Sequence, residues 1–277
     1  MTIRPVTPDD VPGVVALLNQ VELTSFASDD TFRETLEKRA AEATRLVAQV
    51  DGEIAGFARS GRGWLWIGVL PAHRGRGIGA ALYDAIDPEL PVRVQVDDED
   101  GRRFVRSRGF ELVHSMRLQA LDLARTPLDG GAGSVSLREL DPNALRDLYL
   151  ESVADIPTAT PRTYTDDDFR LQVAESPILD RDASCAILED GEPVAFSIVI
   201  SNRTTGRAGA QMTGVRRDHR GRGLALAVKA ASLRRARDAG LQTMLAANDL
   251  ENAPMLAVNR KLGFEPSVLV EHYEKSR

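Results

Sequence analysis

The pentapeptide "HRGRG" stands at residues 73–77 and again, unchanged, at residues 219–223, which is 219 − 73 = 146 positions later. Three explanations are open: coincidence, an RGG element that binds nucleic acid, or two copies of one ligand-binding unit. RGG elements belong to low-complexity, disordered sequence. Each copy here lies instead between apolar segments, in "WLWIGVLPAHRGRGIGAALYDAI" (64–86) and in "AQMTGVRRDHRGRGLALAVKAAS" (210–232). This setting disfavours an RGG element.

The composition is that of a globular protein, with 277 residues of which 43% are hydrophobic and 27% charged. The net charge of −6 disfavours nucleic acid as a partner, because phosphate binding calls for a basic surface. No apolar run approaches the roughly 20 residues of a membrane helix, and the first residues show no signal-peptide pattern. The single cysteine, Cys185, can form neither an intrachain disulfide nor a metal site by itself. These features predict a cytoplasmic protein with no metal and no membrane partner.

The same elements follow one another in both halves of the chain. Each half opens with a short strand and a capped helix, in "TIRPVTPDDVPGVVALLNQV" (2–21) and "SVSLRELDPNALRDLYLESV" (134–153). Each continues with two β-type runs joined by Asp-Gly, which is a strong hairpin signal, at residues 51–52 and 190–191. Matching elements in matching order make coincidence untenable.

The sequence therefore predicts a tandem duplication. After the shared pentapeptide, "SRGFEL" (107–112) corresponds to "KLGFEP" (261–266). A glycine-rich linker, "TPLDGGAGS", lies near residues 126–134. The expected domains are residues 1–126 and 133–277.

In each copy the glycine-rich turn opens a helix, expected from about residue 77 to 86 and from about 222 to 239. The first N–H groups of a helix lack partners and carry the positive end of the helix dipole. Glycines let a diphosphate approach that backbone closely. The alternative is a tight strand-to-helix turn that binds nothing. A Rossmann motif does not fit, because a polar loop precedes the glycines, and a Walker loop does not fit, because no Gly-Lys-Ser/Thr follows.

These residues resemble the GNAT superfamily of acyl-CoA-dependent N-acyltransferases, whose signature is (Arg/Gln)-x-x-Gly-x-(Gly/Ala). The signature is met at residues 74, 77 and 79 and again at 220, 223 and 225. The resemblance covers both halves and implies an α+β fold. It consists of two tandem GNAT-like domains, each a mixed, mostly antiparallel sheet flanked by helices, as in the mycothiol synthases. It also implies that the fourth strand splays from the fifth. A β-bulge is expected at Gly68-Val69 and Gly214-Val215.

The resemblance further implies acetyl-CoA as co-substrate, with pantetheine along the fourth strand and the diphosphate on the glycine turn. The residues expected to contact it in the first copy are Val69, Arg74, Gly75, Arg76, Gly77, Ile78 and Gly79. Those expected in the second copy are Val215, Arg220, Gly221, Arg222, Gly223, Leu224, Ala225, Asn252 and Asn259.

Asn252 and Asn259 belong to a second family segment, Asn-x-x-Ala-x-x-x-Tyr before Gly-Phe. Asn252 matches its asparagine, while Asn259 stands at the tyrosine, which in the family often protonates the departing CoA thiolate. The first copy has Asp98 and Val105 at these two positions. The two asparagines share one helix face, which suits either a polar ligand or solvent. The second domain is therefore expected to be the catalyst, and the first a CoA-binding or structural domain.

The implied reaction is transfer of an acetyl group to a primary amine of a small molecule or peptide, by direct attack in a ternary complex. The alternative is an inactive CoA-binding sensor or scaffold, because the tyrosine and a fourth-strand carboxylate are missing. The catalytic residues stay open, with Asp249, Glu251, His272 and Tyr273 as possible proton carriers of the second domain. Residues 158–169 occupy the acceptor-shaping segment of the family, and their aspartates either attract a cationic amine or cap a helix. A monomer or a homodimer is expected.

Overall fold

The computed structural model describes residues 1–22, 24–38, 40–128, 133–156 and 163–276. Two compact units divide the chain: unit 1 is Met1–His114 with Val270–Arg277, and unit 2 is Ser115–Leu269. Within the described ranges, no helix is both long and apolar enough to cross a membrane.

Unit 1 is a mixed sheet with helices, in which the strands follow the order β1-β2-β3-β4-β5-β12. All described pairs are antiparallel except β4 with β5, which is parallel. Its elements in chain order are β1 (Thr2–Pro5), the 3-10 turn η1 (Pro8–Asp10), α1 (Val11–Val21), α2 (Asp29–Lys38), η2 (Ala40–Glu42), β2 (Thr44–Val50), β3 (Glu53–Gly61), β4 (Trp64–Val69), η3 (Pro71–His73), α3 (Ile78–Ile86), β5 (Val92–Val96) and α4 (Glu99–Arg106).

Unit 2 repeats this plan, with strands in the order β6-β11-β10-β9-β8-β7 and a parallel pairing of β10 with β11. Its elements are β7 (Ser134–Ser136), η4 (Pro142–Leu145), α5 (Arg146–Ala154), α6 (Asp166–Phe169), the π-helical turn η5 (Arg170–Ala174), β8 (Cys185–Glu189), β9 (Glu192–Asn202), β10 (Arg207–Val215), η6 (Arg217–His219), α7 (Leu224–Asp238), β11 (Thr243–Asp249) and α8 (Ala253–Lys261). The α+β class and the mostly antiparallel sheets expected from the sequence are confirmed.

Both Asp-Gly hairpins form where the sequence predicts them. Asp51 and Gly52 have φ of 51° and 87°, and Asp190 and Gly191 have 51° and 83°. Positive φ at both positions of a two-residue turn matches the twist of the flanking strands, and aspartate and glycine tolerate it. Strands β2 and β3, and likewise β8 and β9, are thereby joined as antiparallel pairs.

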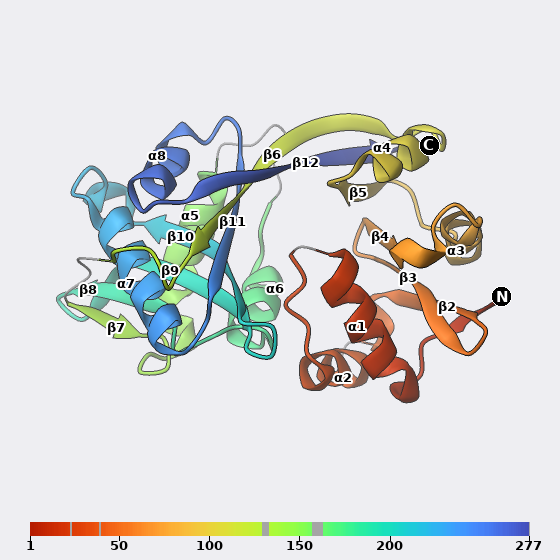
Figure 1. Cartoon of the computed structure of the whole chain (residues 1–277). Coiled ribbons are helices and arrows are strands. Elements are labelled where there is room, and N and C mark those ends of the chain that lie inside the picture. The colour runs from red at the N-terminus through yellow and green to blue at the C-terminus, as the bar shows by residue number, and fades with distance from the viewer. Residues whose placement is uncertain (23, 39, 129–132, 157–162, 277) are drawn as a thin grey trace. The chain divides into compact units, whose positions relative to one another are not determined.

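The last strand of each repeat pairs in the unit formed by the other repeat. Strand β6 (Glu111–Asp122) pairs with β11 through residues 116–122. Strand β12 (Glu265–Lys275) pairs with β5 through residues 271–275, and its blue end lies beside β5 in Figure 1. The expected boundaries 1–126 and 133–277 follow the sequence repeat. The compact units differ from them because most of β6 belongs to unit 2 and the end of β12 belongs to unit 1.

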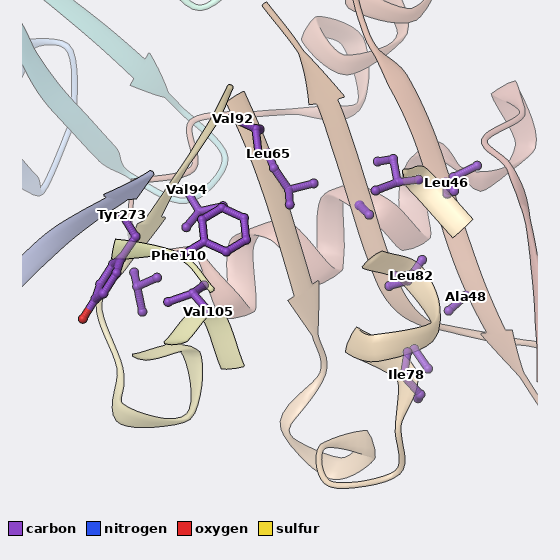
Figure 2. Packing of buried hydrophobic residues seen from close by; sticks show 14 residues of the cluster. Leu46, Ala48, Leu65, Ile78, Leu82, Val92, Val94, Val105, Phe110 and Tyr273 are labelled. Atoms are coloured by element: carbon purple, nitrogen blue, oxygen red, sulfur yellow. The ribbon is translucent and has the colours of Figure 1, made fainter. Parts of the chain in front are cut away.

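The core of unit 1 includes a residue from the far end of the chain. Tyr273 of β12 is 1% exposed and belongs to the cluster that contains Val94, Val105 and Phe110. Figure 2 shows its ring on the side of the cluster where these three residues lie. The first repeat therefore needs the C-terminal strand to complete its core.

We expect Tyr273→Ala to lower the free energy of unfolding of unit 1 by about 3 kcal/mol, as for other buried aromatic residues truncated to alanine. Urea unfolding followed by a probe in unit 1 measures the loss. Ser276→Ala, on an exposed residue three positions later, is the control and should change stability by less than about 0.5 kcal/mol. Equal stability of Tyr273→Ala and wild type would contradict the role of this strand.

Candidate functional site

In both units the two parallel strands pair at one end and diverge at the other. Strand β10 pairs with β11 through Arg207–Gly209, although β10 continues to Val215 and β11 to Asp249. Strand β4 pairs with β5 at Trp64 and Leu65 alone. The expected splay of the fourth strand from the fifth is confirmed. Beyond the paired residues, the backbone groups of the two strands do not form hydrogen bonds with each other.

The β-bulge expected at Gly68-Val69 and Gly214-Val215 is wrong at both places. Strand β4 pairs with β3 without a register shift, and the irregularity in β10 lies between Ala210 and Met212. The glycines serve close packing instead. A Cβ on Gly214 would lie 2.3 Å from Ser152 Oγ of α5, and one on Gly68 would lie 2.2 Å from the Trp66 ring.

The two glycine turns share one backbone conformation. Gly75 and Gly77 have φ of 74° and 81°, and Gly221 and Gly223 have 77° and 79°. A Cβ at any of the four would meet no atom within 4 Å, so the space above the turn is open. In the described part of the chain, no backbone acceptor is bonded to the N–H groups of residues 221–225. The turn that opens α7 can therefore receive an anionic group.

The first arginine of each copy shapes the turn. Arg220 Nε donates to the Val215 carbonyl at 3.1 Å, and Arg74 Nε donates to the Val69 carbonyl at 3.3 Å. Arg220 also bonds Asp155 Oδ2 at 2.7 Å. Hydrogen bonds from Arg217 and Arg220 hold the pKa of the Asp155 carboxyl below its usual range. In both units, the same hydrogen bond thus links the end of the fourth strand to the glycine turn.

The repeated histidines fasten the turn to the hairpin. His73 Nε2 lies 3.3 Å from Glu53 Oε2, and His219 Nε2 lies 3.1 Å from Glu189 Oε2. Both glutamates flank the Asp-Gly turns of the hairpins. This shared contact explains why the histidine recurs in both copies.

Asn252 and the first-copy aspartate at its position are helix caps. The side chain of Asn252 accepts from Met255 N at 3.2 Å, at the start of α8. Asp98 accepts from Gly101 N at 2.7 Å, at the start of α4. Asparagine and aspartate both satisfy a first-turn N–H, so this position has a structural role in each unit.

Asn259 is fully buried, which excludes the solvent-facing alternative. Its Nδ2 donates to Gln119 Oε1 at 2.8 Å and to Asn248 Oδ1 at 2.7 Å. Its Oδ1 accepts from Lys229 Nζ at 2.5 Å. Both amide protons and one lone pair of the amide oxygen are engaged, and the network links α7, α8, β11 and β6.

Lys229 was missed by the sequence analysis. It lies in the middle of α7, is 2% exposed, and its ammonium lies 5.0 Å from the centre of the Phe264 ring. Burial lowers its pKa to about 7. One feature of the sequence could have indicated that Lys229 is buried: it stands inside the alanine- and leucine-rich helix, with Val228 and Ala230 as apolar neighbours.

The structure also places Cys185 and the start of α6. Cys185 is buried, donates to the Val228 carbonyl, and has its pKa raised to about 11 by burial, so it is no thiolate nucleophile. Thr165, not an aspartate, caps α6, and Asp168 completes the capping box. Residues 157–162 lie outside the described residues.

The four residues expected as possible proton carriers of the second domain differ in the unit to which they belong and in their burial. His272 and Tyr273 lie in unit 1, so their assignment to the second domain is wrong. Glu251 is exposed, whereas Asp249 is buried at the end of β11. Among the described residues, no cluster of three or more histidine, cysteine or carboxylate side chains could hold a metal ion.

Two splayed parallel strands, connected by a glycine turn and the helix that it opens, define an acyltransferase of the GNAT type. Models of this family match the chain twice. The acetyltransferase (GNAT) family matches residues 144–264, and an acetyltransferase (GNAT) domain matches residues 41–112. The chain belongs to the GNAT family and is a tandem-domain N-acetyltransferase.

Curated relatives and solved structures agree with this assignment. The mycothiol acetyltransferase of Amycolatopsis mediterranei is 30% identical over 79% of this chain and 80% of its own length. That of Streptomyces coelicolor is 28% identical over 95% and 91%. A tandem GNAT protein from the clavulanic acid biosynthesis pathway superposes with a TM-score of 0.72 at 20% identity, covering 99% of this chain and 98% of that one. The last likeness concerns the fold.

Proposed function

We propose that unit 2 transfers an acetyl group from acetyl-CoA to a primary amine, and that unit 1 binds CoA or serves as structure. The observation that carries the proposal is the open glycine turn of α7 beside the splayed ends of β10 and β11. The turn offers backbone N–H groups to the diphosphate, and the splayed strands offer unpaired backbone groups to the pantetheine amides.

The contrast between the two units supports unit 2 as the catalyst. With the 146-residue offset of the turns, Lys229 corresponds to Tyr83 in unit 1. With the offset of the Gly-Phe segments, 263 − 109 = 154, Asn259 corresponds to Val105. Val105 belongs to the apolar core of unit 1, and Tyr83 packs against that core. Unit 1 therefore has no counterpart of the buried polar network of unit 2.

The burial and the raised pKa of the cysteine support direct attack in a ternary complex. Cys185 is the single cysteine of the chain, and burial raises the pKa of its thiol to about 11. An acyl-cysteine intermediate would require a thiolate. Initial-rate lines for two substrates should therefore intersect, and parallel lines would contradict direct attack.

Calorimetry with acetyl-CoA, combined with a thiol-release assay over a panel of primary amines, tests the function. Because the curated relatives are mycothiol acetyltransferases, the de-acetylated amine form of mycothiol is the first acceptor in the panel. Binding of acetyl-CoA together with amine-dependent release of CoA is the expected result. Binding without release for every amine would identify a sensor and contradict catalysis.

A further inference from the structure

Asp249 ends strand β11, beyond the last pairing of that strand with β10. On β11, Met244 and Ala246 pack in the core that includes α7, and Asn248 bonds Asn259 of α8. Side chains alternate across a strand. Asp249 therefore lies on the opposite face of the sheet, at its splayed end.

One oxygen of this carboxylate is engaged and the other is not. Oδ1 accepts from the backbone N–H of Glu251 at 2.9 Å. Oδ2 is buried and has no hydrogen-bond partner among the described residues, although Asp249 as a whole is 6% exposed. A buried carboxylate oxygen without a donor is unfavourable, and such oxygens normally bind a cation or an N–H group. The missing partner is therefore a donor that the described chain does not supply.

The first repeat also has a carboxylate at this place. Asn248 of β11 and Val96 of β5 pair with corresponding residues of β6 and β12, so the residue that follows Val96, Asp97, is the counterpart of Asp249. Asp97 is half-buried, and unlike Asp249 it is not among the described side chains that have a buried oxygen without a hydrogen-bond partner. The buried, unpartnered carboxylate oxygen thus occurs in the unit to which we assign catalysis. Glu251, the other carboxylate nearby, is exposed.

We propose that Asp249 Oδ2 binds the ammonium group of the acceptor and is the catalytic base of unit 2. This inference rests on the proposed function. The carboxylate takes one proton from R-NH3+ and leaves a neutral amine. The amine lone pair attacks the thioester carbonyl carbon, so that a C–N bond forms. The C–S bond then breaks, and the second ammonium proton goes to the CoA thiolate. The products are the amide, CoA thiol and protonated Asp249, which releases its proton to water.

Asp249→Asn tests the proposal, because the asparagine oxygen can still accept from Glu251 N while the charge is lost. Turnover is expected to fall about 100-fold, as for other lost general bases, with acetyl-CoA affinity within about twofold of wild type. Glu265→Gln, on an exposed residue at the start of β12 in unit 2, is the matched control and should keep wild-type turnover. Turnover of Asp249→Asn within about threefold of wild type would overturn the proposal.

A second measurement needs neither turnover nor a folded variant. In the presence of CoA, millimolar ethanolamine, cysteamine or D-glucosamine should raise the Tm of the wild-type protein. Ethylene glycol, which lacks the ammonium of ethanolamine, should not raise it. If none of the three amines raises the Tm, the role of Asp249 is overturned. If an amine raises the Tm but the thiol-release assay shows no release of CoA from acetyl-CoA, the proposed function is contradicted instead. The failure of this inference and the failure of the proposed function are therefore distinguishable.

Discussion

Gly223→Glu is expected to lower turnover of acetyl-CoA about 1000-fold, which corresponds to about 4 kcal/mol. Gly223 precedes α7 with φ of 79°, and a side chain there would meet no protein atom within 4 Å. The fold therefore loses about 1–2 kcal/mol, the cost of the left-handed conformation for other residues. The larger effect falls on the ligand, because the carboxylate occupies the open space above the turn and repels a diphosphate.

Two further glycines make this experiment specific. Gly240→Glu, just beyond the other end of α7, has a φ of 85° and the same open surroundings, so it carries the same strain and charge. It should retain turnover in the thiol-release assay and affinity in calorimetry. Gly77→Glu makes the matching change in unit 1 and should also retain turnover. Loss of turnover with Gly77→Glu alone would contradict the assignment of catalysis to unit 2.

Lys229→Met is expected to stabilise the protein near pH 6, and the gain should shrink as the pH rises. Burial lowers the pKa of Lys229 from 10.5 to about 7. Below pH 7 the folded state carries a buried ammonium, at a cost on the order of 5 kcal/mol. Between pH 7 and 10.5 the unfolded state binds a proton that the folded state does not, so wild-type stability rises with pH. Methionine keeps the length of the side chain and does not titrate.

The test is how the difference in unfolding free energy between Lys229→Met and wild type changes with pH. Loss of the Lys229 donor leaves Asn259 Oδ1 without its partner, which costs about 1–3 kcal/mol at every pH. Urea unfolding at several pH values between 6 and 10 separates the two contributions. Lys261→Met, on an exposed lysine at the end of α8, is the control and should show no such trend. A constant difference between Lys229→Met and wild type would contradict a buried, titrating lysine.

Much of the fold could be predicted from local signals. The Asp-Gly hairpins form because those two residue types accept positive φ at both turn positions. The glycine turns before α3 and α7 were placed within two residues for the same kind of reason. The repeated order of these signals was enough to identify two domains of one family.

The site could be predicted less completely. The sequence predicts bulges at Gly68 and Gly214, but a glycine in a strand also serves close packing, and the sequence does not show which neighbour approaches. The sequence predicts a CoA contact for Asn252 from the family resemblance, and the cap that its side chain forms on α8 became visible only in the structure. His272 and Tyr273 follow the second repeat in sequence, yet they lie in unit 1 because β12 pairs with β5.

The sequence by itself determined the duplication, the class of fold, the family and the positions of the two glycine turns. These depend on backbone preferences and periodicities that act within a few residues. The tertiary structure decided the exchange of the last strands, the burial of Lys229 and the environment of Asp249. Each depends on residues distant in the chain, as in the bond from Asn259 to Gln119 across 140 positions. The free energy of a buried charge is fixed by what surrounds it, and the surroundings exist only after the chain has folded.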